Sequence, residues 1–526
     1  MSRHRTRTNA IQRACLGAAA LALVGVPALA AGAANANLDA PTYAGEVAGI
    51  LFDNCAGCHR PGQTAPMSLL SYQEARPWAK SIARNVEDRV MPPWHATGGT
   101  AKFANDRSLS EEEIDKLVRW AKAGAPAGDL EKAPLPPRFP DSEWRLGEPD
   151  FVVTLEQVDV PADGPDVFKD LIGKAALPED KWITAVEILP GNPRVVHHVI
   201  TFGVKGFDVD PQGGWLGAWA AGTAPMVFPE GTGRLLPKGS NLVADMHYHP
   251  SGTAESDVTR IGLHFADAEP AKELTNIWVM NAGFEIPPGD PNHEVRADYV
   301  FWQDGRIMSL TPHMHYRGKD FRYVLHRADG TQETIMEVAR WDFNWQTVYT
   351  LDEPVKVSRG DRLECIAHYD NSADNPANPD PTRAVTFGDE SYDEMMIGFI
   401  DYIVDDGVRP KSPFEIRTEM IDAVAAEHPG EVFKISGKPP EKRGEPNSWA
   451  PLHLPRQGDG TFYVISNDTL QAAAVTDIQW SGDSFTSKVS LSGQQFDFSG
   501  EVKSDGSIET TLHLPDNDMP WTGEKV

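Results

Sequence analysis

A proline-rich run divides this sequence into two parts of different character. Residues 133–140 read APLPPRFP and should be extended, because proline can neither continue a helix nor donate to a sheet. Before this run the pattern is helical: Ser110 is expected to cap a helix with Glu113 as its capping-box partner, and Gly124 is expected to end it. We therefore predict a small all-α domain at 31–132 and a linker at 133–147.

Beyond the linker, short β-like runs alternate with Gly, Pro, Asn and Asp. Strands at such spacing are typical of β-sandwich domains, and 526 residues are too many for a single core. The predicted fold class is therefore multidomain. The all-α domain would be followed by two all-β sandwich (jelly-roll-like) domains at 148–270 and 271–405, and by a small C-terminal β domain of unknown role at 406–526.

The first 30 residues have the features of a secretory signal peptide. Four arginines and no acidic residue precede residue 14, an apolar run follows at 14–26, and the small-residue pattern Ala28-Leu29-Ala30 ends it. The run is too short to cross a membrane, which takes about 20 residues. We expect a signal peptide at 1–30, a periplasmic or secreted protein, and no membrane span. A second cleavage pattern, Ala34-Asn35-Ala36, leaves the exact end of the signal open.

The chain is acidic, with a formal net charge of −28 at pH 7. Removal of the signal would take away four arginines and make the charge more negative still. Such a surface argues against nucleic acid and anionic membranes as partners and would suit a basic redox partner.

The four cysteines leave no pair for a structural disulfide. Cys15 lies in the predicted signal, Cys55 and Cys58 share one motif, and only Cys365 remains. Cys365 lies in a strand-like run, and we interpret it as a small buried hydrophobic residue.

The segment Cys55-Ala56-Gly57-Cys58-His59 has the spacing of a covalent haem-attachment site. The two thiols suit two haem vinyl groups, and His59 would be the proximal iron ligand of one haem c. A chance match and a dithiol redox pair are the alternatives. For the distal ligand Met91 is favoured, with Met67 and His95 as rivals. Residues 40–130 resemble the small class I cytochromes c, whose distal methionine commonly precedes a proline, as Met91 does here.

Six of the 16 histidines fall into three tight clusters in the β region. Residues i and i+2 of a strand share a face, so His313 and His315 can reach one metal ion while Met314 faces away. Adjacent residues point to opposite faces, so His197 and His198 can share an ion only if their strand ends or bulges there. Imidazoles with a thioether and no thiolate suit copper, and zinc fits on ligand type alone.

Four short motifs in the β region occur in an order shared with a known family. They are Val195-Val196-His197-His198-Val199, Asp245-Met246-His247-Tyr248, Leu310-Thr311-Pro312-His313-Met314-His315 and Asp393-Glu394-Met395. On these motifs, residues 148–405 resemble the type II ascorbate-dependent copper monooxygenases, the group of the peptidylglycine α-hydroxylating and dopamine β-monooxygenases. That family has two β-sandwich domains, each of which holds one copper at a solvent-filled cleft.

The resemblance implies two copper sites. His197, His198 and His247 would hold an electron-transfer copper in the domain at 148–270, and the catalytic residues His313, His315 and Met395 would hold an oxygen-binding copper in the domain at 271–405. His249 and Met396 lie beside matched ligands, so a shift of one or two positions stays open.

Two departures from the family shape the functional hypothesis. The animal enzymes are rich in disulfides and use ascorbate, whereas this β region can form no disulfide and a haem motif precedes it. We expect a monooxygenase that takes electrons from an external donor through the haem to copper, and uses O2 to hydroxylate a C–H bond of a small molecule or peptide. The alternatives are an electron-transfer or copper-binding cytochrome without oxygenase activity, and an oxidase that only reduces O2. The aromatic segment 341–345 could line the cleft or pack in a core.

Overall fold

The structure is a computed structural model that describes residues 40–526, apart from 64, 140–141, 176, 205–213, 221–222, 412, 438–449, 467–468, 492–493 and 515–517. The predicted signal peptide at 1–30, with Cys15, lies outside the described residues. In the described part of the chain, no helix is long and apolar enough to cross a membrane.

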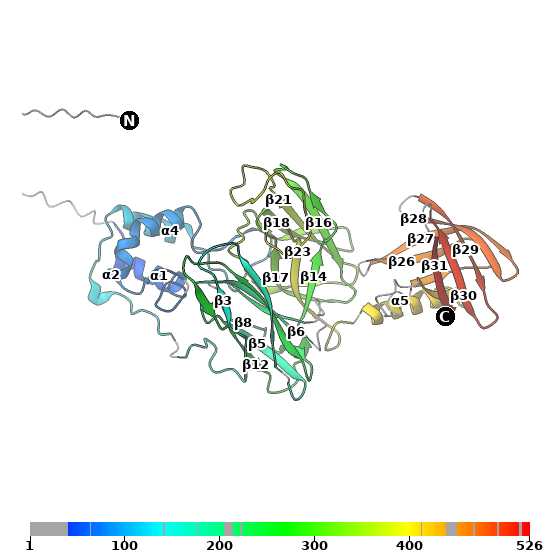
Figure 1. Ribbon diagram of the computed structural model, residues 1–526, viewed down its shortest axis with the longest axis horizontal. Helices are drawn as coiled ribbons and strands as arrows, with labels where there is room; N and C mark the ends of the chain where they lie inside the picture. The colour runs from blue at the N-terminus through cyan, green and yellow to red at the C-terminus, as the bar shows by residue number, and fades with distance from the viewer. Residues whose placement is uncertain are drawn as a thin grey trace, which may run out of the picture. The chain divides into compact units, whose positions relative to one another are not determined.

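Residues 41–132 form a group of short helices around one apolar core (Figure 1). The predicted capping box is confirmed, since Ser110 accepts from the Glu113 backbone and the Glu113 side chain accepts from the Ser110 backbone. Leu51, Leu117 and Trp120 are fully buried in the core. The helices are η1 (Tyr43–Val47), α1 (Ala48–Asn54), α2 (Tyr72–Ala75), η2 (Arg76–Trp78), α3 (Ala79–Glu87), α4 (Glu111–Lys122) and η3 (Leu130–Lys132).

One segment between α3 and α4 packs against the strand-rich region instead. Strand β1 (Ala96–Gly98) pairs antiparallel with β19 (Gln332–Val338). Trp94 joins the apolar core of residues 277–404, with its ring centroid 4.9 Å from that of Tyr349. Asn105 donates to the carbonyl of Val348. The segment therefore ties the helical part of the chain to the strands beyond the linker.

The first β-sandwich follows the linker, and its two main sheets share one core. One sheet has the order β4-β10-β6-β7, the other β13-β9-β5-β12-β2 with β8 beside β5, and β3 pairs with β11. Val199 and Met246 of the first sheet pack in the same apolar cluster as Ile183 and Ile261 of the second. The strands are β2 (Phe151–Thr154), β3 (Val158–Val160), β4 (Val167–Gly173), β5 (Lys181–Leu189), β6 (Val196–Val204), β7 (Trp215–Ala220), β8 (Met226–Val227), β9 (Thr232–Leu236), β10 (Asn241–Tyr248), β11 (Glu255–Asp257), β12 (Arg260–Phe265) and β13 (Lys272–Glu273).

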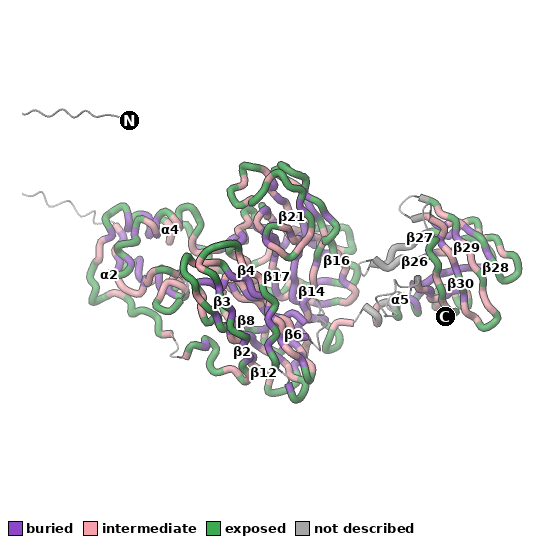
Figure 2. The backbone as a smooth tube through the Cα atoms, in the orientation of Figure 1, coloured by how far each residue is buried: buried purple, intermediate pink, exposed green. Residues whose placement is uncertain are grey.

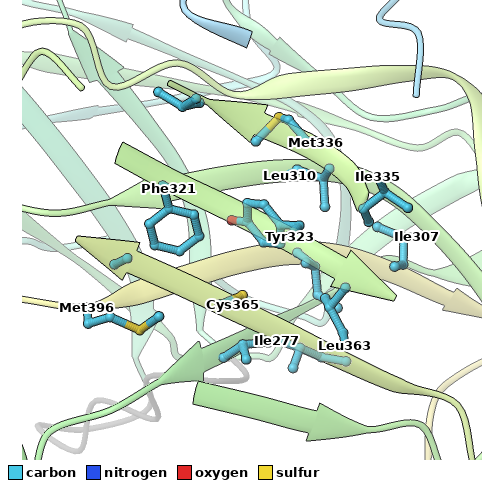
Figure 3. Packing of buried hydrophobic residues seen from close by; sticks show 14 of the residues in the cluster. Ile277, Ile307, Leu310, Phe321, Tyr323, Ile335, Met336, Leu363, Cys365 and Met396 are labelled. Atoms are coloured by element: carbon cyan, nitrogen blue, oxygen red, sulfur yellow. The ribbon is translucent and has the colours of Figure 1, made fainter. Parts of the chain in front are cut away.

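The second β-sandwich has the sheets β1-β19-β18-β21-β16 and β14-β23-β17-β20, with the short pair β15-β22. Its core contains Cys365, which is fully buried beside Tyr323 and Met396 as expected of a small hydrophobic residue (Figure 3). Buried residues run through the inside of both sandwiches, while their connecting loops are mostly exposed (Figure 2). The further strands are β14 (Thr275–Met280), β15 (Glu285–Ile286), β16 (His293–Val300), β17 (Gly305–His313), β18 (Gly318–His326), β20 (Tyr349–Val357), β21 (Arg362–Tyr369), β22 (Val385–Thr386) and β23 (Ile397–Val404).

The last part of the chain is helix α5 (Pro413–Glu427) and a closed barrel in which each strand pairs with the next. Val475, Phe498 and Ile508 fill its interior. The prediction of β domains after residue 148 is thus confirmed, and the barrel closure adds a detail that the sequence did not predict. The strands are β24 (Val432–Gly437), β25 (Ala450–His453), β26 (Gly460–Ser466), β27 (Thr469–Ser481), β28 (Ser484–Leu491), β29 (Gln494–Val502), β30 (Ser507–His513) and β31 (Asp518–Lys525).

Candidate metal centres

A bulge in β6 brings His197 and His198 to one side of their sheet. In the pairing of β10 with β6, His247 lies opposite His198, whereas the next residue, Tyr248, lies opposite Val196. His197 is therefore the extra residue of a β-bulge, which re-aims its side chain. The strand has the irregularity that two adjacent ligands require.

Three ring nitrogens face one another at this bulge. His198 Nδ1 lies 3.2 Å from His197 Nδ1 and 3.3 Å from His247 Nδ1, and ligand atoms of the three residues lie within 4.8 Å of one another. The opposite nitrogens have oxygen partners: His197 Nε2 is 3.2 Å from Asn344 Oδ1, and His247 Nε2 is 2.7 Å from Asp166 Oδ2. Oxygen partners on the far side of the ring fix its orientation in the manner of an outer shell around a metal site. His249 does not join this cluster, because its Nδ1 bonds Asp166 Oδ1 at 2.7 Å and its side chain is 67% exposed.

The second cluster lies at the end of β17. His313 and His315 have ring centroids 5.2 Å apart, and Met314 between them is fully buried in the core. The expectation that Met314 faces away from the two histidines is thus confirmed. Gln346 Oε1 lies 2.5 Å from His313 Nδ1, and the carbonyl of Asp393 lies 3.3 Å from His315 Nδ1. The Nε2 atoms are therefore the ones these contacts leave for a metal.

The segment 393–395 adjoins this second cluster. Glu394 is fully buried, and its carboxylate accepts from the backbone N–H of His315 at 2.8 Å and of Arg317 at 2.6 Å. Burial raises the pKa of Glu394 to about 8, against the pull of these hydrogen bonds. Met395 is half-buried, whereas Met396 is fully buried in the apolar core (Figure 3). Of the two methionines, Met396 is thus committed to packing, and Met395 is the one with its side chain outside that core.

The pKa values of His197, His198, His313 and His315 all lie below the ordinary value of a histidine. Burial lowers the pKa of His313 to about 4 and that of His315 to about 3. Burial, together with the neighbouring histidines, also lowers the pKa of His197 to about 4 and that of His198 well below its usual value. Neutral imidazole is the form that binds a metal, and the donor set fits copper, with zinc as the alternative on ligand type.

These shifts predict that the copper-free protein loses stability in mild acid. Between the unfolded pKa of about 6.5 and the lowered folded value, the unfolded chain binds more protons than the folded one, so stability falls as the pH falls. For His313 alone the loss from pH 6.5 to 4 is roughly 3 kcal/mol. Urea unfolding at several pH values between 7 and 5 measures this slope. A His313→Gln variant should show a shallower slope, and an equal slope would contradict the prediction.

A single aromatic side chain lies between the two clusters. Phe343 is buried, and its ring stacks on His197 at a centroid distance of 5.3 Å, with His315 at 6.2 Å and Tyr316 at 4.5 Å. In the same loop, Asn344 contacts His197 of the first cluster and Gln346 contacts His313 of the second. The aromatic segment 341–345 therefore lies at the candidate centres.

The predicted haem-attachment motif begins where α1 ends. Cys58 and His59 follow in a turn in which both backbone N–H groups donate to the Cys55 carbonyl, at 3.1 Å and 2.9 Å. The Nδ1 of His59 is buried without a hydrogen-bond partner. Met67 packs against the helical core with Cys55. Met91 is half-buried, and its backbone N–H donates to the Asn85 carbonyl.

His95, the third candidate for the distal ligand, is buried within the segment that packs on the second β-sandwich. Burial lowers the pKa of His95, while the nearby charge of Asp342 raises it and that of Arg340 lowers it further. This position makes His95 a residue of the strand-rich side of the molecule.

Several residues around the two clusters carried no sequence signal of their own. In the sequence, Asp166 lies far from every histidine cluster. Glu394 was noted only as part of its motif. Tyr316 directly follows His315, and Gln346 follows an aromatic run. Only their contacts with the histidines reveal them.

Two imidazole clusters therefore lie on adjoining β-sandwiches, on either side of Phe343. Residues 295–426 match the family model described as the copper type II ascorbate-dependent monooxygenase, C-terminal domain. This segment contains His313, His315 and Met395. The protein is accordingly a copper-dependent monooxygenase, an oxidoreductase.

Other comparisons add nothing to this assignment. No curated protein matches the chain. The structure of infectious bursal disease virus Gx strain is 10% identical over 52% of this chain and 76% of its own, with a TM-score of 0.15. The infectious bursal disease virus VP2 subviral particle is 9% identical over 53% of this chain and 88% of its own, with a TM-score of 0.14. TM-scores this low do not indicate a shared fold.

Proposed function

We propose that this protein is an exported haem- and copper-dependent monooxygenase that hydroxylates a C–H bond of a small molecule or peptide. The observation that carries the proposal is the pair of imidazole clusters on either side of Phe343, the second of which lies in the segment matched to the monooxygenase family. The balanced reaction takes R–H, O2, two electrons and two protons to R–OH and H2O.

We assign two copper ions and one haem c to the residues of the motifs. His197, His198 and His247 would hold one copper, His313, His315 and Met395 the other, and Cys55, Cys58, His59 and Met91 the haem. When bound, the haem would accept electrons from an external donor, the first copper would relay them, and the second would support reduction of O2. The protein's own residues orient the ligands: Asn344 and Asp166 hold rings of the first cluster, and Gln346 holds a ring of the second.

One pKa shift and one contact support the haem part of this proposal. Burial raises the pKa of the Cys55 thiol to about 12, so it stays protonated at neutral pH and is a poor thiolate for a dithiol redox pair. The Arg340 guanidinium donates to the carbonyl of Arg89 at 3.1 Å. Arg340 directly precedes the loop with Phe343, and Arg89 lies two residues before Met91, so the helical part contacts the loop between the candidate centres.

The experiment that tests the proposed electron route is stopped-flow reoxidation of the reduced haem by O2. The full-length protein would be used copper-loaded and copper-stripped. We expect reoxidation to be much faster in the copper-loaded protein, because copper would offer the electrons a route from the haem to O2. Equal rates in the two forms would mean that the haem does not feed a copper-dependent oxygen site.

Exchanging His315 for Ala is expected to abolish copper-dependent O2 consumption while the haem is still reduced at the normal rate. His315 is 4% exposed and belongs to the second cluster alone, so the first cluster should keep its metal. O2 uptake and haem absorbance measure the two effects separately. A His293→Ala variant, in which the altered side chain pairs with Asp290, is the matched control. Retained copper-dependent uptake in His315→Ala would contradict the assignment.

A further inference from the structure

Asp166 contacts three side chains near the candidate metal centres, and none of the sequence motifs includes it. It lies directly before β4, and its side chain is only 17% exposed. Its carboxylate is 2.7 Å from His247 Nε2 and 2.7 Å from His249 Nδ1, and it accepts from the Tyr316 hydroxyl at 3.1 Å. One carboxylate therefore joins three side chains from two β-sandwiches.

The contacts of Asp166 reach both candidate metal centres. His247 is fully buried and belongs to the first cluster. Tyr316 comes from the second sandwich, directly after His315 of the second cluster. The same oxygen, Oδ2, contacts His247 and accepts from Tyr316. The first cluster is thus tied, through one oxygen atom, to the chain segment that positions the second.

The ring of Tyr316 also packs against the loop that lies between the clusters. It lies 4.5 Å from the ring of Phe343, which in turn stacks on His197. A separation of the sandwiches at this point would therefore break the Asp166–Tyr316 hydrogen bond and expose Phe343.

We propose that Asp166 and Tyr316 are positioning residues that form a bridge between the two β-sandwiches and fix the separation of the two metal clusters. The inference rests on the proposed function only for the identity of the metals. Charge assistance strengthens the bridge, because the acceptor is a carboxylate that also orients His247. Electron passage between the clusters depends on their separation, so the bridge keeps them within reach of each other.

Four variants separate the bridge from ordinary fold stability, and one of them, Asp166→Ala, removes the whole carboxylate. Tyr316→Phe removes only the hydroxyl, and Asp166→Asn keeps the shape and one acceptor oxygen but loses the charge. His249→Gln alters the exposed contact of Asp166 and leaves the bridge intact, which makes it the matched control.

The first readout needs no copper. Hydrogen exchange followed by mass spectrometry on the full-length, copper-free chain compares the segments 161–168 and 314–318. We expect Tyr316→Phe to speed exchange roughly fivefold in both segments, as the loss of one hydrogen bond implies, and His249→Gln to leave 314–318 unchanged. Unchanged exchange in Tyr316→Phe would overturn the bridge.

The second readout is the distance between the two centres in the Cu(II)-loaded chain, measured by dipolar electron paramagnetic resonance. We expect one narrow distance distribution in the parent protein, a broader and longer one in Tyr316→Phe, and partial rescue in Asp166→Asn relative to Asp166→Ala. Identical distributions in all variants would overturn the proposal. Binding of fewer than two Cu(II) ions per parent chain would instead count against the proposed function, and the exchange experiment would still decide the bridge.

Discussion

Exchanging Asp401 for Asn is expected to lower the free energy of unfolding of the β region by about 3–5 kcal/mol. Asp401 on β23 pairs with Arg234 on β9, so the contact joins the two sandwiches, and both side chains are less than 8% exposed. Asp401 also accepts from Ser309 at 2.8 Å and Asn276 at 2.9 Å. Asn keeps the shape but leaves the Arg234 cation buried without its counter-charge.

The surroundings of Arg234 explain why its guanidinium cannot reach water in place of the lost carboxylate. The guanidinium lies over the rings of Trp215 at 4.5 Å and Phe228 at 4.7 Å, and burial lowers the pKa of Arg234. Since Trp215 is itself buried, its fluorescence should report the transition directly.

The measurement is thermal and urea unfolding of the full-length chain with tryptophan fluorescence. For a region of this size we expect a fall in Tm of roughly 10 °C. Asp405→Asn is the matched control, because it alters a half-exposed pair with Arg306 and should cost about 0.5 kcal/mol or less. The double variant Arg234→Met, Asp401→Asn should recover part of the loss, since it removes the unpaired charge. A shift in Asp401→Asn no larger than that of the control would refute the role of this pair.

Local patterns were enough to predict several features of the secondary structure. The capping box at Ser110 is present because its donors and acceptors lie within one turn of chain. The opposite directions of His313 and Met314 follow from the alternation of a strand, which is a property of two or three residues. The bulge at His197 was the condition under which adjacent histidines could share an ion, and the pairing of β6 with β10 contains it.

The partners of these histidines could not be predicted, because they come from distant parts of the chain. Asp166 reaches His247 across 81 residues, and Asn344 reaches His197 across 147. Neither contact leaves a periodic pattern in the sequence, since the first depends on the pairing of β4 with β10 and the second on how the two sandwiches meet. The segment around Trp94 is a similar case: it lies among helices in the sequence, and only the pairing of β1 with β19 shows that it packs on strands.

The sequence alone could not decide between Met395 and Met396 as the metal ligand. Both follow Glu394 just before β23 begins at Ile397, where the backbone is not yet a regular strand and alternation gives no certain direction. The structure separates them by packing, with Met396 fully buried in the core. The ligand role of Met395 stays a prediction that copper binding to a Met395→Leu variant can test.

Exchanging Glu394 for Ala is expected to lower the free energy of unfolding by about 2–6 kcal/mol and to empty the second metal centre. The change leaves the backbone N–H groups of His315 and Arg317 buried without acceptors, at about 1–3 kcal/mol for each. Since Glu394 holds the backbone of His315 in place, the imidazole should lose its position as well. Glu394→Gln should fall between the parent and Glu394→Ala, because it keeps one of the two acceptor oxygens.

Copper stoichiometry and unfolding of the Glu394 variants measure the two effects independently. We expect two Cu(II) ions per parent chain and one per Glu394→Ala chain, with the signal of the first cluster retained, because its three histidines lie on β6 and β10. Asp389→Ala, at an exposed position five residues earlier, is the control and should keep both ions. Full copper loading in a destabilised Glu394→Ala protein would show that Glu394 serves the fold of the second sandwich and not the placement of His315.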